Sequence, residues 1–107
     1  YDPTSDSFLD LEGASIPLGL VDGTDYEEYS HPDLHPGSVV LAATDGIWET
    51  RRGDGELYGM DRLRAFIRSH ASMSSSEISR AMRDELSLFR GEALQDDDVT
   101  FVIVKMI

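Results

Sequence analysis

The chain has 107 residues, of which 40% are hydrophobic and 28% are charged. That composition is typical of one soluble globular domain and argues against a wholly disordered segment. The formal net charge of −12 repels phosphate backbones and anionic lipids, so nucleic-acid binding and binding to a membrane surface are disfavoured. The sequence contains no cysteine, which excludes disulfides and thiolate metal sites and is compatible with the cytoplasmic location that we expect. Because no apolar run approaches the ~18 residues of a membrane span, we expect no membrane insertion.

The charges are unevenly distributed along the chain. Residues 1–50 hold eleven Asp or Glu and no Lys or Arg, whereas eight of the nine basic residues lie between Arg51 and Arg90. The first residue is Tyr1 rather than methionine, and we therefore expect the chain to be a piece of a longer protein.

The N-terminal third predicts short strands separated by turns. Weak alternation indicates strands over residues 7–11 and 16–21, and residues 26–29 are placed to pair back across a turn. The turns themselves are expected at Glu12–Gly13 and at Asp22–Gly23, because Asp-Gly is a strong tight-turn signal.

A strong strand is predicted over residues 39–43, followed by a hairpin-like loop at 53–55 and then by two helices. Apolar residues recur at helical spacing over about 60–70 and again over about 75–90. Ser74 followed by Glu77 forms a capping-box pattern at the start of the second helix, and Gly91 ends it. A last strand is predicted over residues 99–104. A strand, two helices and a strand in this order predict an α+β fold in which the helices cover one face of the sheet.

Carboxylates stand at the ends of both strong strands. Asp45 and Gly46 follow the strand at 39–43 and form what we call the first acidic corner. Three consecutive aspartates, Asp96 to Asp98, precede the final strand and form the second acidic corner. If the two strands run antiparallel, the end of one meets the start of the other, and these carboxylates can share one cation. Oxygen ligands of this kind suit magnesium, manganese or calcium rather than zinc or copper, and the calcium-loop spacing is absent.

Simpler explanations remain for each of these features. Asp45–Gly46 is also a common strand-ending turn, and Asp96 to Asp98 is also compatible with a solvated acidic turn. Since side chains alternate along a strand, only one of Asp97 and Asp98 is expected to face a given surface, and the spacing does not choose between them. The pair Arg51–Arg52 after the first corner suits either a substrate phosphate or the nearby acidic side chains, and the second interpretation is favoured.

Four motifs, in this order, resemble a known family. They read PLG at 17–19, LHPGSVVLAATDGIWET at 34–50, GELYGMDRL at 55–63 and DDVTFVIVK at 97–105. Together they cover nearly the whole chain and resemble the C-terminal half of bacterial SpoIIE/RsbU-type serine/threonine phosphatases, which belong to the metal-dependent, type 2C-like protein phosphatases.

The resemblance implies a fold, a cofactor and roles for particular residues. The family fold is an α-β-β-α sandwich around a binuclear Mn²⁺ or Mg²⁺ centre, where a metal-activated water hydrolyses phosphoserine or phosphothreonine. Asp45 and Asp97 match metal ligands of that family, while Asp98 and Gly46 match supporting positions. No phosphate-binding residue is assigned.

The resemblance begins roughly midway through the family domain. Residues 1–107 are therefore expected to be the C-terminal portion of a single phosphatase domain whose N-terminal half, with its Gly-Asp metal motif, is absent. We expect the chain alone to be inactive or nearly so. Sheet surface that the missing half would cover is expected to be exposed, and the chain is expected to form a homodimer through it or to cover it with rearranged segments.

The resemblance also implies partners in signalling. It implies a regulatory phosphoprotein substrate resembling an anti-sigma-factor antagonist, an upstream sensor or receiver domain in the parent chain, and a role in bacterial sigma-factor regulation. Two alternatives stay open: a non-catalytic protein-interaction module that has kept the fold, and a small acidic cation-binding domain.

Overall fold

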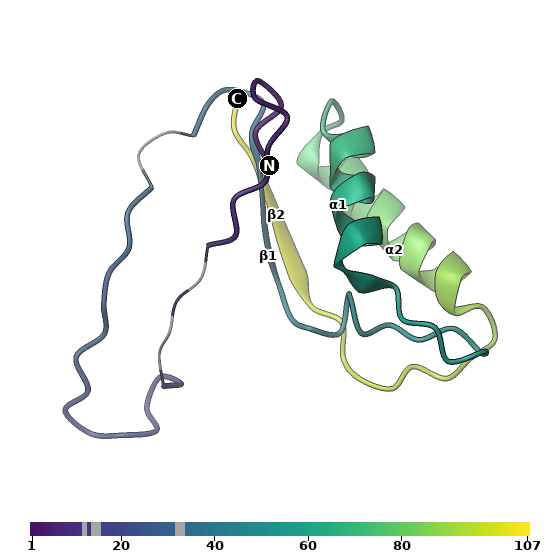
Figure 1. Cartoon of the computed structure of the whole chain (residues 1–107), viewed down its shortest axis with the longest axis horizontal. Coiled ribbons are helices and arrows are strands. Elements are labelled where there is room, and N and C mark those ends of the chain that lie inside the picture. The colour runs from purple at the N-terminus through teal and green to yellow at the C-terminus, as the bar shows by residue number, and fades with distance from the viewer. Residues whose placement is uncertain (12, 14–15, 32–33) are drawn as a thin grey trace.

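The chain folds as two helices packed on one side of a two-stranded antiparallel sheet. The computed structural model describes residues 1–11, 13, 16–31 and 34–107. The elements follow in the order β1 (Val39–Ala43), α1 (Gly59–His70), α2 (Ser75–Arg90) and β2 (Phe101–Lys105). Figure 1 shows both helices on one side of the strand pair, while residues 16–31 lie in an arch on the other side. The first ten residues stay close to the fold, because Tyr1 pairs with Val39 and because Asp6 and Asp10 form ion pairs with α1. The predicted α+β class, with an antiparallel sheet covered by two helices, is confirmed.

The two strands pair in a register that buries one face of the sheet and exposes the other. β1 and β2 pair antiparallel, from Val39 opposite Lys105 to Ala43 opposite Phe101. Phe101, Ile103 and Lys105 are partly buried, whereas the two valines between them are exposed, Val102 at 58% and Val104 at 49%. One face of the sheet therefore packs on the protein and the other carries exposed apolar side chains, as expected for a two-faced strand.

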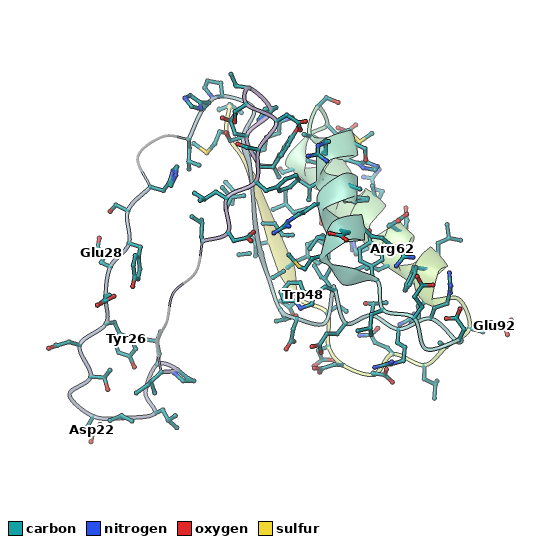
Figure 2. All side chains as sticks on the ribbon, in the orientation of Figure 1. Asp22, Tyr26, Glu28, Trp48, Arg62 and Glu92 are labelled. Carbon is teal, nitrogen blue, oxygen red and sulfur yellow. The ribbon has the colours of Figure 1, made fainter. Side chains whose placement is uncertain are left out.

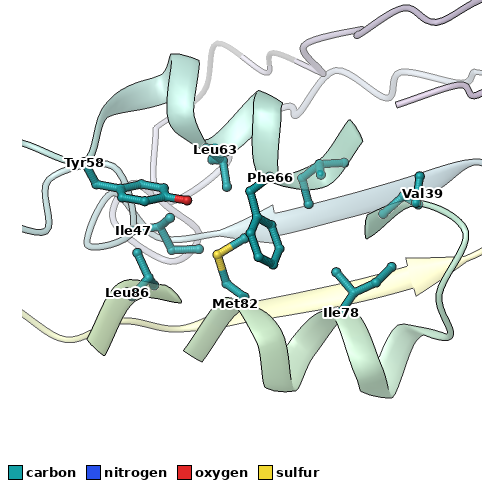
Figure 3. Close-up of a cluster of buried hydrophobic side chains, with 10 residues drawn as sticks. Val39, Ile47, Tyr58, Leu63, Phe66, Ile78, Met82 and Leu86 are labelled. Atoms are coloured by element: carbon teal, nitrogen blue, oxygen red, sulfur yellow. The ribbon is translucent and has the colours of Figure 1, made fainter. Parts of the chain in front are cut away.

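Both helices lie close to their predicted positions, since α1 begins one residue earlier than expected and α2 matches. Each helix buries a stripe of side chains at helical spacing, and the two stripes meet over the sheet (Figure 3). The shared core contains Val39, Ile47, Tyr58, Leu63, Phe66, Ile67, Ala71, Ile78, Met82 and Leu86. Lys105 fastens β2 to the turn between the helices, because its Nζ donates to the carbonyls of Ala71 and Met73, both at 2.6 Å.

The predicted capping box at the start of α2 is present. The Glu77 N–H donates to Ser74 Oγ at 3.3 Å, and the Ser74 N–H donates to Glu77 Oε2 at 2.9 Å. The Ser74 side chain, followed by the Ser74 backbone, holds the pKa of the Glu77 carboxyl below its usual value. Two amide donors that the helix leaves free are thereby satisfied.

Replacing Ser74 with alanine removes the side-chain half of this cap. We expect Ser74→Ala to lower the free energy of unfolding by about 1 kcal/mol, measured by urea denaturation of the 107-residue chain. Ser72→Ala is the matched control, because Ser72 is exposed in the turn between the helices. Equal effects of the two substitutions would contradict the capping role.

The strands predicted for the N-terminal third do not form, so that prediction is wrong. Within the described residues, no strand forms over 7–11, 16–21 or 26–29, and the only pairing near them is an isolated bridge between Asp2 and Ser7. Leu18 and Leu20 are 85% and 70% exposed. A strand needs a hydrogen-bonding neighbour, and residues 16–31 arch into solvent without one, as the positions of Asp22, Tyr26 and Glu28 in Figure 2 show.

The turn predictions have mixed outcomes. Asp22–Gly23 forms a turn in which Gly23 has φ +70, and the loop at 53–55 is closed by a bridge between Arg51 and Leu57. The expected turn at Glu12–Gly13 lies partly outside the described residues.

Candidate functional site

The two acidic corners lie side by side, because β1 ends where β2 begins. Beyond the last strand pair, the Thr44 N–H donates to the Thr100 carbonyl at 2.9 Å, and the Thr100 N–H donates to Thr44 Oγ1 at 3.1 Å. The Thr44 hydroxyl also lies 3.3 Å from the Asp98 carbonyl oxygen. The antiparallel arrangement predicted for the corners is therefore confirmed for the backbone.

Gly46 allows the closest contact between the two corners. A Cβ on this residue would lie 2.3 Å from the Asp98 carbonyl oxygen, closer than any side chain tolerates. After Gly46 the chain turns tightly: the Glu49 N–H donates to the Asp45 carbonyl at 2.9 Å, and Thr50 Oγ1 donates to the Gly46 carbonyl at 2.7 Å. Ile47, fully buried, anchors this turn in the core. The corner thus requires glycine for space rather than for an unusual φ.

The carboxylates of the corners differ in their surroundings, although all four are exposed. Asp97 Oδ1 accepts the Asp98 N–H at 2.7 Å, which restrains the Asp97 side chain. Asp96 lies 3.4 Å from Arg51 Nε. Asp96 and Asp97 line a cavity that Gly46 also borders, whereas Asp45 and Asp98 are not part of its wall.

The structure brings these segments together without completing a metal site. Among the described residues there is no group of three or more His, Cys, Asp or Glu side chains placed to hold a metal ion. The chain therefore supplies at most part of a ligand set from its described residues.

Arg51 and Arg52, which follow the first corner, bind different partners. Arg52 forms ion pairs with Asp54 at 2.8 Å and with Glu56, as the favoured interpretation predicted. Arg51 instead reaches across to Asp96 and donates to the Gly55 carbonyl at 3.0 Å, which ties the 53–55 loop to the second corner. Neither arrangement leaves this pair of arginines free to act as a ready-made phosphate clamp.

The ion pairs of the 51–57 loop predict an acid-sensitive stability. The hydrogen bond from Arg52, followed by that from the Glu56 N–H, lowers the pKa of Asp54 from 3.8 to about 2. Because the folded-state pKa is depressed, this stabilisation is present above pH 3.8 and is lost as the pH falls toward 2. We expect Arg52→Gln to move the Asp54 titration, followed by carboxyl NMR, back toward 3.8. An unchanged titration would contradict the assigned cause.

Sequence reasoning missed one group of residues near the corners. Arg83, Ser87 and Arg90 lie on the C-terminal half of α2 and line the same cavity as Asp97. Their spacing of four and three residues places them on one helix face, which was the available signal.

The comparisons with known proteins agree with the family resemblance. The whole chain, residues 1–107, matches the family described as Stage II sporulation protein E (SpoIIE). It is 27% identical over 107 residues to phosphoserine phosphatase RsbU of Bacillus subtilis (strain 168), covering all of this chain and 31% of that protein. Its fold is similar to the SiaA-PP2C domain of Pseudomonas aeruginosa, with a TM-score of 0.66 and 29% identity over 69% of this chain and 30% of the other.

These matches identify the family of the chain and show how much of each relative it covers. The chain spans about a third of the length of the proteins that it matches. None of the helices formed by the described residues is long and apolar enough to cross a membrane. Because the family match extends over every residue, the chain belongs to the SpoIIE family and has the fold of a type 2C-like phosphatase segment.

Proposed function

We propose that this chain is the C-terminal portion of a metal-dependent phosphatase domain that hydrolyses phosphoserine or phosphothreonine on a regulatory phosphoprotein. The observation that carries the proposal is the junction of the two corners. Asp45 follows the end of β1 by two residues, and Asp97 precedes the start of the neighbouring antiparallel strand β2 by four. Between them, Gly46 is seated against the Asp98 carbonyl. The match of the whole chain to the SpoIIE family supports the same reaction class.

The donor set at the junction suits a hard cation. Its carboxylates are exposed and offer only oxygen ligands, which favours Mn²⁺ or Mg²⁺ over softer metals. We assign Asp45 and Asp97 as ligands and Asp98 and Gly46 as supports. Since the described residues contain no group of three potential ligands, the remaining ligands would come from the N-terminal half of the domain.

The chain's own contribution to the reaction is to position charge. A bound cation pair would neutralise the phosphate and lower the pKa of the attacking water. The carboxylate of Asp97 is restrained by the Asp98 N–H, and the Thr44 hydroxyl joins the two strand ends beneath the junction. Close packing of Gly46 on the second corner fixes the spacing of the two segments. Such preorganisation matters because small displacements of catalytic groups are costly.

The proposed substrate is a phosphoprotein resembling an anti-sigma-factor antagonist, acted on in the cytoplasm. RsbU, to which the chain is similar, is a phosphoserine phosphatase by name. We further propose that a sensor or receiver domain precedes the phosphatase domain in the complete protein and controls it.

Hydrolysis of a phosphoserine peptide by the complete protein tests this function. We expect phosphate release in the presence of Mn²⁺ and its loss in EDTA, while the isolated 107 residues release little or none. Turnover by the complete protein that survives EDTA would contradict the metal-dependent reaction. Robust Mn²⁺-dependent turnover by the isolated chain would contradict the proposal that it holds only part of the centre.

A second candidate is a non-catalytic interaction module that has kept the fold. The observation in its favour is the incomplete ligand set within the described residues. It predicts that the complete protein neither hydrolyses the phosphopeptide nor binds Mn²⁺.

A further inference from the structure

A cavity of about 460 Å³ adjoins the second acidic corner. It lies where the C-terminal end of α2, the 51–57 loop and the segment before β2 gather at one end of the molecule (Figure 1). One part of its wall is formed by Gly46, Asp96 and Asp97, and another by Arg83 and Arg90 of α2. The cavity thus runs from the proposed reaction centre to a pair of cationic side chains.

Arg83 and Arg90 have no acidic partner within the part of the chain that the structure describes, in contrast to five of the six other arginines. Within the described residues, ion pairs with carboxylates are made by Arg51, Arg52, Arg62, Arg64 and Arg68. Neither Arg83 nor Arg90 lies within 4.0 Å of a carboxylate oxygen in this part of the chain. The cavity wall as a whole carries Arg51, Arg83 and Arg90 against Glu49, Asp96 and Asp97, so its charges balance. The two guanidinium groups on its α2 side have no carboxylate partner among the described residues, and positive charge is concentrated on that side.

The surroundings of Arg90 indicate that its hydrogen bonding is incomplete. Its guanidinium donates to Gln95 Oε1 at 2.7 Å, but its Nε is buried and has no partner among the described residues. A buried donor left unsatisfied is unfavourable. Ser87 lies between the two arginines on the same helix face and adds a hydroxyl to the cavity wall.

We propose that this cavity binds an anionic side chain of the substrate polypeptide next to its phosphorylated residue, with Arg83 and Arg90 as the specificity-determining residues. The inference rests on the proposed phosphatase function, because it places the reacting phosphate at the adjacent acidic corner. Guanidinium groups bind carboxylates and phosphates bidentately, so an Asp or Glu and a second phosphorylated residue share the required chemistry. The apolar part of the wall, formed by Leu57, Leu86, Leu94, Val99 and Phe101, accommodates the stem of that side chain.

Steady-state kinetics of the complete protein with three synthetic phosphoserine peptides test the proposal. One peptide carries glutamates beside the phosphoserine, one carries glutamines, and one carries glutamines and a second phosphoserine. We expect Arg83→Gln/Arg90→Gln to raise KM for the glutamate peptide about 10-fold, the effect of losing one or two exposed charge-assisted contacts. The glutamine peptide and p-nitrophenyl phosphate should be turned over as by the unmodified protein.

Matched variants separate this role from a structural one. Arg80→Gln removes the same charge from α2 outside the cavity wall and should leave all three KM values unchanged. Arg83→Glu should reverse the preference, so that a lysine-flanked peptide is favoured over the glutamate peptide. An equal rise in KM for all peptides, or no rise for either anionic peptide, would overturn the proposal. A rise confined to the doubly phosphorylated peptide would identify phosphate rather than carboxylate as the ligand.

A binding measurement keeps the inference separate from the proposed function. If the complete protein releases no phosphate from any substrate, the phosphatase proposal fails. Fluorescence anisotropy of the labelled glutamate peptide then still decides the inference. Binding that weakens about 10-fold in Arg83→Gln/Arg90→Gln but not in Arg80→Gln supports the cavity, and unaltered binding contradicts it.

Discussion

Asp45→Asn in the complete protein should reduce Mn²⁺-dependent hydrolysis of a phosphoserine peptide by about 100-fold or more, equivalent to about 2.7 kcal/mol of transition-state stabilisation. The substitution keeps the size of the side chain but removes the negative charge that would hold the cation. Because Asp45 is exposed and only its carbonyl takes part in the turn, accepting the Glu49 N–H, stability should change by no more than about 0.5 kcal/mol. Asp97→Asn should lower turnover to a similar extent, and its side-chain oxygen can still accept the Asp98 N–H.

The matched control is Asp84→Asn, which removes one negative charge from the exposed side of α2. Its turnover should stay within about threefold of the unmodified protein, since surface charges far from the reaction contribute little. If Asp45→Asn kept full turnover, or lost it only by unfolding, the ligand assignment would be wrong. Turnover is measured by phosphate release and folding by circular dichroism on the same samples.

Gly46→Ala is the second substitution with a large expected effect. Its added Cβ would lie 2.3 Å from the Asp98 carbonyl oxygen and 3.1 Å from the Asp98 carbonyl carbon. Both contacts are with backbone, which cannot swing aside as a side chain can. We expect a loss of about 3 kcal/mol in the free energy of unfolding and a fall in turnover of about 10- to 100-fold as the corners move apart.

Gly53→Ala is the control for this substitution, because no heavy atom lies within 4 Å of its added Cβ. Its effect should stay within about 0.5 kcal/mol. Urea denaturation of both variants measures the difference in stability, and phosphate release by the complete protein measures the difference in activity. Similar stability of the two variants would contradict the close packing of the corners.

The elements with strong local signals could be predicted from the sequence. Ser74 and Glu77 indicated the start of α2, because a capping box is formed by residues only three positions apart. Both helices and the strands at 39–43 and 101–105 followed from apolar spacing, although the last strand begins two residues later than predicted. Antiparallel pairing was a geometric hypothesis, and the register of Ala43 opposite Phe101 confirms it.

The N-terminal third shows where local patterns are insufficient. Residues 16–21 have the composition of a strand, yet within the described residues they have no strand beside them. A segment with high strand propensity forms a strand only when neighbouring segments hydrogen-bond to it and pack against it. The composition of residues 16–21 therefore indicates a segment able to form a strand, but no described residue pairs with it.

The candidate site could be outlined from the sequence, but its contacts could not. Acidic residues at strand ends pointed to Asp45 and to the run Asp96 to Asp98, and only the family resemblance selected Asp97. The contact of Gly46 with Asp98 joins positions far apart in sequence and emerges only from the register. Arg83 and Arg90 could not be singled out, because an arginine on a helix face is usually solvated. Their lack of carboxylate partners among the described residues becomes visible only when the ion pairs of the other arginines are known.

The proposed reaction requires both strand-end corners to hold the same divalent cation. Anomalous scattering from crystals of the complete protein soaked in Mn²⁺ shows whether they do. We expect an anomalous peak bonded to carboxylate oxygens of both Asp45 and Asp97, at roughly 2.0–2.6 Å as for other hard cations with oxygen ligands. A peak bonded to neither residue or to only one of them, or no peak at the junction at all, would contradict it.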